Sequence, residues 1–407
     1  MAMTETAGLT SSLVGTGDLF QLLRDGKPRT RGELARLSSL ARSTITTRVD
    51  ALLASGLLEP VGEAASTGGR PPTRFALNRH DRVVLAVDLG ASHASVAVMD
   101  LGGQLLEHRT VDCDIADGPD AVLDLVASIG RELLGELGRE VGDVAGVGIG
   151  VPGPVAHATG RPANPPIMPG WHDVDVPALL GRHFDGPVLV DNDVNLMALG
   201  EYVTSWSATS HLLLVKVATG IGAGVISGGV LQRGAQGTAG DIGHINVNRG
   251  ADVPCQCGNR GCLEALASGP AIGRILTAEG MEAQTSADVV ALVKQGNLQA
   301  IQAVRQAGRD IGEVLTACVS LMNPQVIVIG GSIAQAGEHI IAGAREVVYA
   351  RSIPLATESL HIVQSRTGAD AAIVGAALLA LDHALSFSNV ENMILANDSR
   401  VPSTVRG

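Results

Sequence analysis

The chain has 407 residues, more than one ordinary domain holds, which indicates two to four domains. Hydrophobic residues make up 45% and charged residues 17%, which excludes a disordered chain, and aromatic residues at 2% leave an aliphatic core. The net charge of −12 excludes a chain that binds nucleic acid over its whole surface. That charge is unevenly divided: residues 1–80 hold 10 Lys and Arg against 7 Asp and Glu, which leaves 19 against 34 for residues 81–407. A basic N-terminal module on an acidic body therefore stays compatible with DNA binding.

Three short helices are predicted in the basic segment. The first covers residues 17–24, and the second begins at Thr30, which forms a T-x-x-E capping box with Glu33. The third extends over residues 42–55, with apolar residues on one face and short hydroxyl side chains and arginines on the other. Such side chains hydrogen-bond to base edges and phosphates, so we expect them to contact DNA. They are Arg42, Ser43, Thr44, Thr46, Thr47 and Arg48.

Two short strands follow this third helix, at residues 57–61 and 73–77, on either side of a glycine-rich loop. Three helices followed by such a hairpin are typical of a winged helix-turn-helix, which we assign to residues 1–80. Gly69 and Arg70 in the loop are expected to reach the minor groove. The alternative is a small helical domain for protein contacts.

The acidic body contains a repeated pattern. Residues 83–104 and 212–232 each consist of a strand, a glycine turn and a second strand, which indicates an internal duplication. Alternating strands and helices around them predict an α/β body with mixed sheets. We place one lobe at residues 81–200, a second at 201–385, and a tail without clear pattern at 386–407, where we expect disorder or a partner contact.

Three cysteines lie within eight residues, Cys255, Cys257 and Cys262, and His244 precedes them by eleven. Three thiolates and an imidazole at this spacing indicate a zinc site. With four protein ligands no coordination position stays open, so the zinc is expected to be structural. A redox pair of cysteines and free thiols are the alternatives.

Several strings resemble the ROK family of repressors and sugar kinases. They are the segment 217–244, VATGIGAGVISGGVLQRGAQGTAGDIGH; the segment 191–195, DNDVN; and the segment 255–264, CQCGNRGCLE. The resemblance covers about residues 81–382 and implies a two-lobed actin-like ATPase fold, the ROK sugar-kinase fold. The winged helix matches the repressor branch of that family.

The resemblance also implies a sugar site. In a kinase, Asp193 would be the catalytic base that accepts the proton of the sugar hydroxyl. Asn192 and Asp193 could instead only cap the helix over residues 194–202. Asp241 is one methylene shorter than the family's Glu, which puts its contact in doubt. The residues implied to bind the sugar are Gly160, Arg161, Asn192, Asp193, Asp241, His244 and Glu264.

The first phosphate turn departs from the family pattern D-x-G-G-T-K. Here Ala91, Ser92 and His93 stand where the family has Gly, Thr and Lys, so a Cβ intrudes and a cation is lost. ATP is therefore not expected as a cofactor, and an enzymatic role is not expected.

These observations predict a cytoplasmic DNA-binding transcriptional regulator of carbohydrate genes, a repressor controlled by a sugar or sugar-phosphate effector. Its expected partners are operator DNA and a second copy of the chain, as a homodimer or homotetramer, and no membrane. The apolar face of residues 298–321 would serve that assembly or belong to the core. An ATP-dependent sugar kinase with an added DNA-binding domain is the alternative, and a scaffold that binds no sugar is a third possibility.

Overall fold

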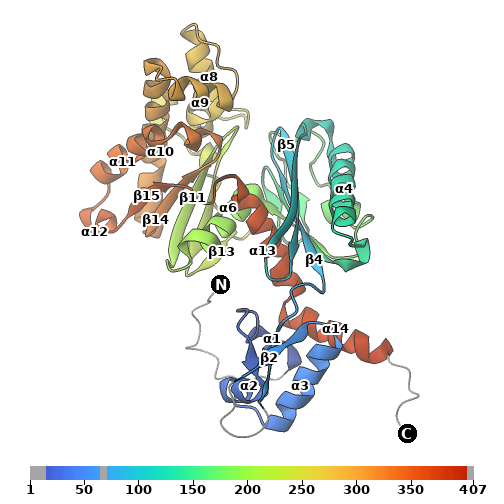
Figure 1. The fold of residues 1–407 in the computed structure, drawn as a ribbon. Coiled ribbons are helices and arrows are strands. Elements are labelled where there is room, and N and C mark those ends of the chain that lie inside the picture. The colour runs from blue at the N-terminus through green and yellow to red at the C-terminus, as the bar shows by residue number, and fades with distance from the viewer. Residues whose placement is uncertain (1–14, 65–70, 401–407) are drawn as a thin grey trace.

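The computed structural model describes residues 15–64 and 71–400, with side chains described as far as residue 395. A small head lies below two lobes that stand side by side (Figure 1). The head is the predicted N-terminal module, joined by one helix from the C-terminal end of the chain.

The head consists of three N-terminal helices and a three-stranded antiparallel sheet with strand order β1-β3-β2. The helix predicted to begin at Thr30 does so: the Thr30 hydroxyl accepts from the Glu33 amide at 3.2 Å, and Glu33 accepts from the Thr30 amide at 2.7 Å. Gly56, at φ +80°, adopts the left-handed conformation that ends the third helix. The elements are α1 (Thr16–Gln21), β1 (Arg29–Thr30), α2 (Arg31–Ser38), α3 (Arg42–Ala54), β2 (Leu58–Glu63) and β3 (Thr73–Leu77).

The two lobes contain sheets of the same topology. In the first, strand order is β10-β7-β4-β5-β6, and in the second it is β13-β12-β11-β14-β15. Each sheet has three consecutive antiparallel strands followed on one side by two parallel strands. This repetition confirms the predicted duplication. The strands are β4 (Val83–Leu89), β5 (His93–Asp100), β6 (Leu105–Asp112), β7 (Val144–Val151), β10 (Val188–Asn192), β11 (His211–Val217), β12 (Ile221–Ser227), β13 (Val230–Gln232), β14 (Val326–Gly330) and β15 (His361–Gln364).

Helices α6 (Asp193–Glu201) and α13 (Ala371–Ala384) pack on each other between the two sheets (Figure 1). They approach closely because glycines face backbone: a Cβ on Gly375 would lie 1.9 Å from the carbonyl oxygen of Leu196. Although α13 belongs to the segment we assigned to the second lobe, it covers strands β4 and β7 of the first. The boundary near residue 200 therefore does not separate two independent lobes.

The remaining helices lie on the outer sides of the sheets. Helix α10 packs along α11, and its buried residues belong to the core of the second lobe. The main ones are α4 (Pro119–Glu136), α7 (Leu263–Ala267), α8 (Gly269–Ala278), α9 (Ser286–Lys294), α10 (Leu298–Met322) and α11 (Glu338–Arg351).

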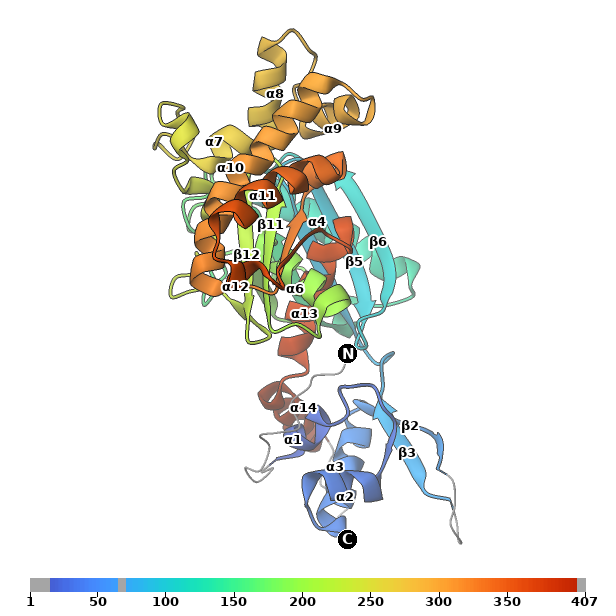
Figure 2. The ribbon, with the colours of Figure 1, turned by 90° about the vertical axis from the view of Figure 1, so that its left-hand side faces the viewer.

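The C-terminal segment differs from the expectation. Instead of disorder, residues Phe387–Arg400 form helix α14, which bends by 52° from α13 and lies against α1 in the head (Figure 2). Val390 and Ile394 are buried in the same apolar cluster as Leu19 and Phe20. The expectation of disorder failed because Val390 and Ile394, four residues apart, form an apolar face. Such a face needs only a partner surface for the segment to become an ordered helix.

Within the described part of the chain, no single helix has the length and apolar composition to cross a membrane. The bent pair formed by residues 368–384 and 387–395 meets that test only when the two are taken together.

Candidate DNA-binding head and sugar-binding site

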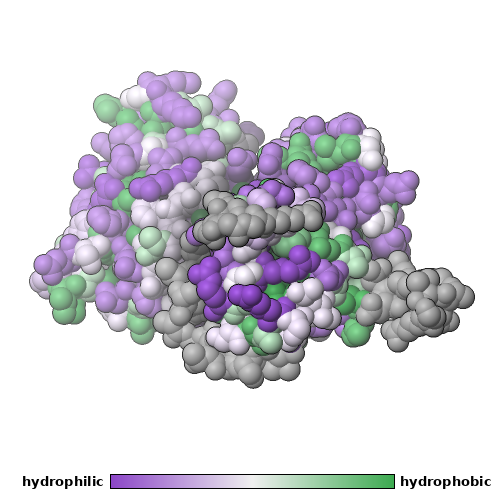
Figure 3. Space-filling model, turned by 60° about the horizontal axis from the view of Figure 1, so that its bottom comes forward, coloured by the Kyte–Doolittle hydropathy of each residue, from purple (hydrophilic) through white to green (hydrophobic). Residues whose placement is uncertain are grey.

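Helix α3 presents the predicted DNA-binding side chains to solvent. Ile45, Val49 and Leu52 have no exposed surface and fix the inner face of the helix against the head's core. On the outer face Thr44 and Arg48 are half-buried and the other predicted residues are exposed. Hydrophilic residues gather on this side of the molecule, where the head comes forward (Figure 3). The exposed residues are Arg42, Ser43, Thr46 and Thr47.

The strand pair predicted to form the wing is present as the antiparallel strands β2 and β3. Arg31 at the start of α2 stacks its guanidinium over the Phe75 ring of β3, 4.6 Å from the centroid, and pairs with Asp50 of α3. These contacts fix the helices against the wing. Gly69 and Arg70 lie outside the described residues.

The four predicted metal ligands come together. One ligand atom each from His244, Cys255, Cys257 and Cys262 lie within 4.8 Å of one another. The thiols of Cys257 and Cys262 are 3.7 Å apart, and Nδ1 of His244 is 3.7 Å from the thiol of Cys255. Tetrahedral zinc with bonds of about 2.3 Å to sulfur needs ligand separations of about 3.8 Å, so the cluster fits the ion. Burial raises the pKa of the Cys262 thiol to about 12, and a metal ion would displace that proton.

The segment that carries this cluster is tied to the second lobe. Arg249 donates to both carboxylate oxygens of Asp310 on α10, at 2.9 and 2.5 Å. Cys262 is the N-cap residue of α7, so the metal cluster and Glu264 in the first turn of that helix are positioned together.

Asn192 and Asp193 lie where β10 passes into α6. The Asn192 side chain caps the helix, accepting from the amides of Val194 and Asn195 at 2.9 and 3.2 Å, and donates to the Gly153 carbonyl at 2.9 Å. The capping role considered for Asn192 is therefore present, through its Oδ1. Its Nδ2 makes the separate bond to Gly153.

The Asp193 carboxylate is paired with Lys216 of β11. Nζ of Lys216 lies 2.5 Å from Oδ2 of Asp193. The Asp193 side chain is 4% exposed and that of Lys216 is 20% exposed. Burial alone would lower the pKa of the Lys216 ammonium, but the carboxylates of Asp193 and Asp88 raise it above its ordinary value. Lys216 therefore stays charged. Burial raises the pKa of the Asp193 carboxyl above its ordinary value, and the charge of Lys216 offsets only part of that effect.

Glu264, Asp241 and His244 gather at the beginning of β12. The Glu264 carboxylate accepts from the Ile221 amide at 3.0 Å, which places an anion on the second glycine turn. Nε2 of His244 lies 3.9 Å from an oxygen of Asp241, so one ring nitrogen faces the thiols and the other a carboxylate. A Cβ on Gly243 would meet the Ile221 carbonyl at 2.2 Å, which shows how closely these segments pack.

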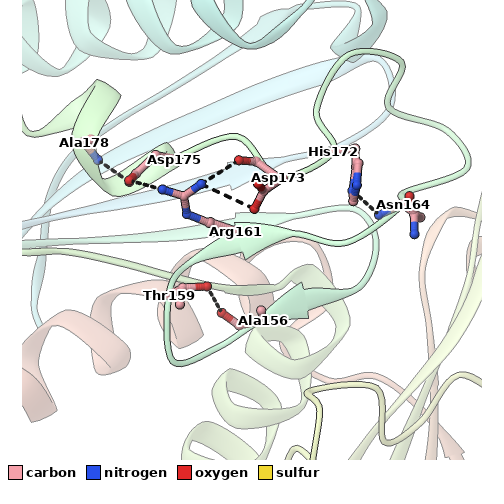
Figure 4. A network of polar contacts seen from close by, with 8 residues as sticks. All are labelled: Ala156, Thr159, Arg161, Asn164, His172, Asp173, Asp175 and Ala178. Atoms are coloured by element: carbon pink, nitrogen blue, oxygen red, sulfur yellow. Dashed lines mark hydrogen bonds and ion pairs between the residues drawn. The ribbon is translucent and has the colours of Figure 1, made fainter.

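Gly160 and Arg161 lie in the short hairpin of β8 (Val155–Ala156) and β9 (Arg161–Pro162). The Arg161 guanidinium donates to Asp175 at 2.6 Å and to the carbonyl and carboxylate of Asp173 at 3.0 and 3.3 Å (Figure 4). Those bonds hold the loop after β9. The hairpin approaches the other predicted sugar residues through His157, whose Nδ1 is 3.7 Å from Asp191.

Both glycine turns are filled by the protein's own groups. The His93 ring folds over the first turn, where a Cβ on Gly90 would meet it at 2.1 Å, and its Nε2 is 3.6 Å from Asp88. On the second turn the Ala218 amide donates to the Gly220 carbonyl at 3.0 Å. In each turn, one of the amides that could contact a phosphate is thus engaged within the protein.

Sequence reasoning missed Lys216 and Arg233. Each stands in or beside a strand and meets its partner only in the folded chain: Arg233 donates to Asp191 at 2.6 Å, forty-two residues away. The only signal was a cation inside the otherwise apolar run LLLVKV. A buried lysine requires a carboxylate partner, and Asp193 was available.

Comparison with known proteins gives the family. Residues 84–383 match the ROK family. The chain belongs to the ROK family. This confirms the predicted resemblance, and the solved structure of a ROK family transcriptional regulator, a homologue of the E. coli MLC protein, confirms the fold class. That structure has a TM-score of 0.79 at 26% identity and covers 94% of this chain and 98% of its own.

Regulators and kinases of the family match different shares of the chain. A putative xylose repressor from Caldicellulosiruptor sp. is 26% identical and covers 91% of this chain and 96% of its own length. A glucokinase from Thermotoga maritima is 31% identical but covers 72% of this chain and 96% of itself. The structure of a Streptomyces griseus glucokinase with glucose and AMPPNP similarly covers 73%, at a TM-score of 0.64 and 26% identity. The additional share matched by the regulators includes residues of the head.

Proposed function

We propose that this protein is a transcriptional repressor of carbohydrate genes, which binds operator DNA through its head and a sugar effector in its body. One observation carries the proposal: relatives named xylose repressor match the chain over about nine-tenths of its length, head included, whereas the glucokinases match the body. The exposed hydroxyl and guanidinium groups of α3 supply the chemistry for DNA contact.

Operator binding tests the placement of the interface. Fragments recovered by genome-wide footprinting of the bound DNA would serve as operators. Arg42→Ala should weaken binding at least about fivefold, because an arginine contact to a base is worth about 1–3 kcal/mol. Arg182→Ala removes the same charge from an exposed position on the body and should leave affinity unchanged. Equal affinity for the two variants would contradict the assignment.

We propose that the His244 cluster holds a structural zinc ion. Four protein ligands leave no open position, so the ion would fix the loop of residues 244–262 instead of reacting with a ligand. Through His244 and the neighbouring Glu264 it would also hold two of the expected sugar contacts in place.

We propose further that the effector acts on the head through packed helices. Asn192 and Asp193 are at the N-terminus of α6, α6 packs on α13, and α13 continues into α14 beside α1. Polar contacts complete the junction: Glu391 accepts from the Gly17 amide at 2.7 Å, and Arg24 pairs with Asp382 at 2.6 Å. A sugar that prefers one arrangement of the lobes would thereby change the position of α3.

The protein would act as a symmetric oligomer, because two heads can then occupy successive major grooves. A monomer with full operator affinity in sedimentation and footprinting experiments would contradict this.

The kinase alternative is supported by the likeness to glucokinases and opposed by two features of the site. The Asp193 carboxylate is already paired with Lys216 at 2.5 Å, and the His93 ring folds over the first phosphate turn. Coupled assays with glucose, N-acetylglucosamine and xylose should show no turnover above background. Turnover that Asp193→Asn abolishes would overturn the regulator-only function.

A further inference from the structure

We infer that the effector is an uncharged sugar and that the site excludes its phosphate ester. This inference rests on the proposed function, which leaves the charge of the effector open. Four features around the beginnings of α6 and β12 support it. They are the pairing of the cations, the excess of carboxylates, the unpaired acceptors and the hydrogen bonds of the turn amides.

The cations of the site are already engaged. Lys216 is 2.5 Å from Asp193, and Arg233 is 2.6 Å from Asp191. Arg161, the third candidate for an anion contact, is bound by two carboxylates of its own loop. At Lys216 or Arg233 a phosphate group would have to displace Asp193 or Asp191, which are 4% and 2% exposed, and a buried charge left without its partner is costly.

The formal charge of the site is negative. Lys216 and Arg233 are the two lysine and arginine side chains that pair with its carboxylates, and they neutralise two of five. An ester with two negative charges would enter against the remaining carboxylates, in surroundings where charges are weakly screened. The five carboxylates are Asp88, Asp191, Asp193, Asp241 and Glu264.

The unused hydrogen-bonding capacity consists of acceptors. Oδ1 of Asp88 and Oδ1 of Asn195 are both buried without a hydrogen-bond partner, in side chains that border the Lys216–Asp193 pair and Asp191. Buried acceptors of this kind require donors. Any sugar hydroxyl can donate to them, but the position taken by an ionised phosphate group would supply only further acceptors.

The turn amides complete the case. The Ile221 amide donates to Glu264, the Ala218 amide to Gly220, and the Gly90 amide to the His93 carbonyl at 2.9 Å. These three amides, Lys216, Arg233 and Arg161 are thus already engaged, whereas two buried acceptors are left for a polyol.

Calorimetric titration of the full-length protein tests the inference. The ligands are glucose and N-acetylglucosamine, each beside its 6-phosphate, together with xylose, and operator retention is measured in parallel. At least one neutral sugar should bind and change operator affinity. Where its ester is tested, the neutral sugar should bind at least about 100-fold more tightly, a factor that corresponds to about 2.7 kcal/mol. Asp88→Ala, which removes the unpaired acceptor, should weaken binding of the neutral sugar at least tenfold, and Asp185→Ala, at an exposed carboxylate, should not.

An ester that binds as tightly as its parent sugar, or more tightly, overturns the inference and leaves the proposed function intact. If neither class binds and operator affinity never changes, both the inference and the effector part of the proposed function are overturned. If Asp88→Ala and Asp185→Ala bind the sugar alike, the role given to the unpaired acceptor is overturned.

Discussion

Val390→Ala should destabilise the head while the body stays folded. Val390 on α14 is 0% exposed and packs in the cluster that contains Leu19 and Phe20 of α1. The change removes two buried methyl groups. Since deletion of one costs about 0.5–1.5 kcal/mol in a core, the free energy of unfolding of the head should fall by about 1–3 kcal/mol.

Scanning calorimetry and operator binding measure this effect. For a unit the size of the head, each kcal/mol lowers the melting temperature by roughly 4–8 °C, so the head's transition should move by roughly 5 °C or more. Because this cluster continues into β4, β5 and α13, the transition of the body should move less than that of the head. Leu395→Ala is the matched control, because this side chain is 64% exposed on the same helix. If both variants melt like the parent protein, α14 does not belong to the core of the head.

Three further outcomes are expected. Cys257→Ser should lower the zinc content measured by atomic absorption and the melting temperature of the body; full zinc occupancy would contradict the assigned ligand set. Lys216→Met should cost about 3–5 kcal/mol in urea unfolding, because the buried Asp193 carboxylate loses its partner, and adding Asp193→Asn should restore most of that loss. Burial is the largest influence on Glu201 and would raise its pKa, but amide and hydroxyl donors of residues 365–367 hold it below the ordinary value of 4.5. Its stabilising contribution is therefore complete above about pH 4.5 and lost as the pH falls through the folded pKa. The stability advantage of the parent protein over Glu201→Gln should shrink from about pH 5 downward. An advantage that stays constant over this range would refute the linkage.

Much of the fold was predictable because local signals and global structure agree. The capping box at Thr30 and the left-handed Gly56 are determined by neighbouring residues, so their physics is contained in a few positions of sequence. The repeated strand, glycine turn and strand likewise predicted two sheets of one topology. The Cys and His spacing predicted a cluster that the folded chain assembles.

The features that escaped prediction depend on contacts between distant segments. Helix α14 has a weak pattern of its own and gains its partner 370 residues earlier in the chain, at Gly17. Lys216 meets Asp193 only because the two lobes fold toward each other. In both cases the sequence contains the residue, and tertiary structure supplies the reason for it.

The participation of α14 in the head has a consequence for how the protein is made. The helices of the head leave the ribosome well before Val390 and Ile394, the later residues that complete their core. At ordinary rates of translation the intervening segment of about 310 residues takes roughly 15 to 60 seconds. During that interval the head lacks Val390 and Ile394, and it gains its full core only when the sugar-binding body has been made. We therefore expect the order of synthesis to keep a nascent chain off its operator until the body that binds the effector has been made.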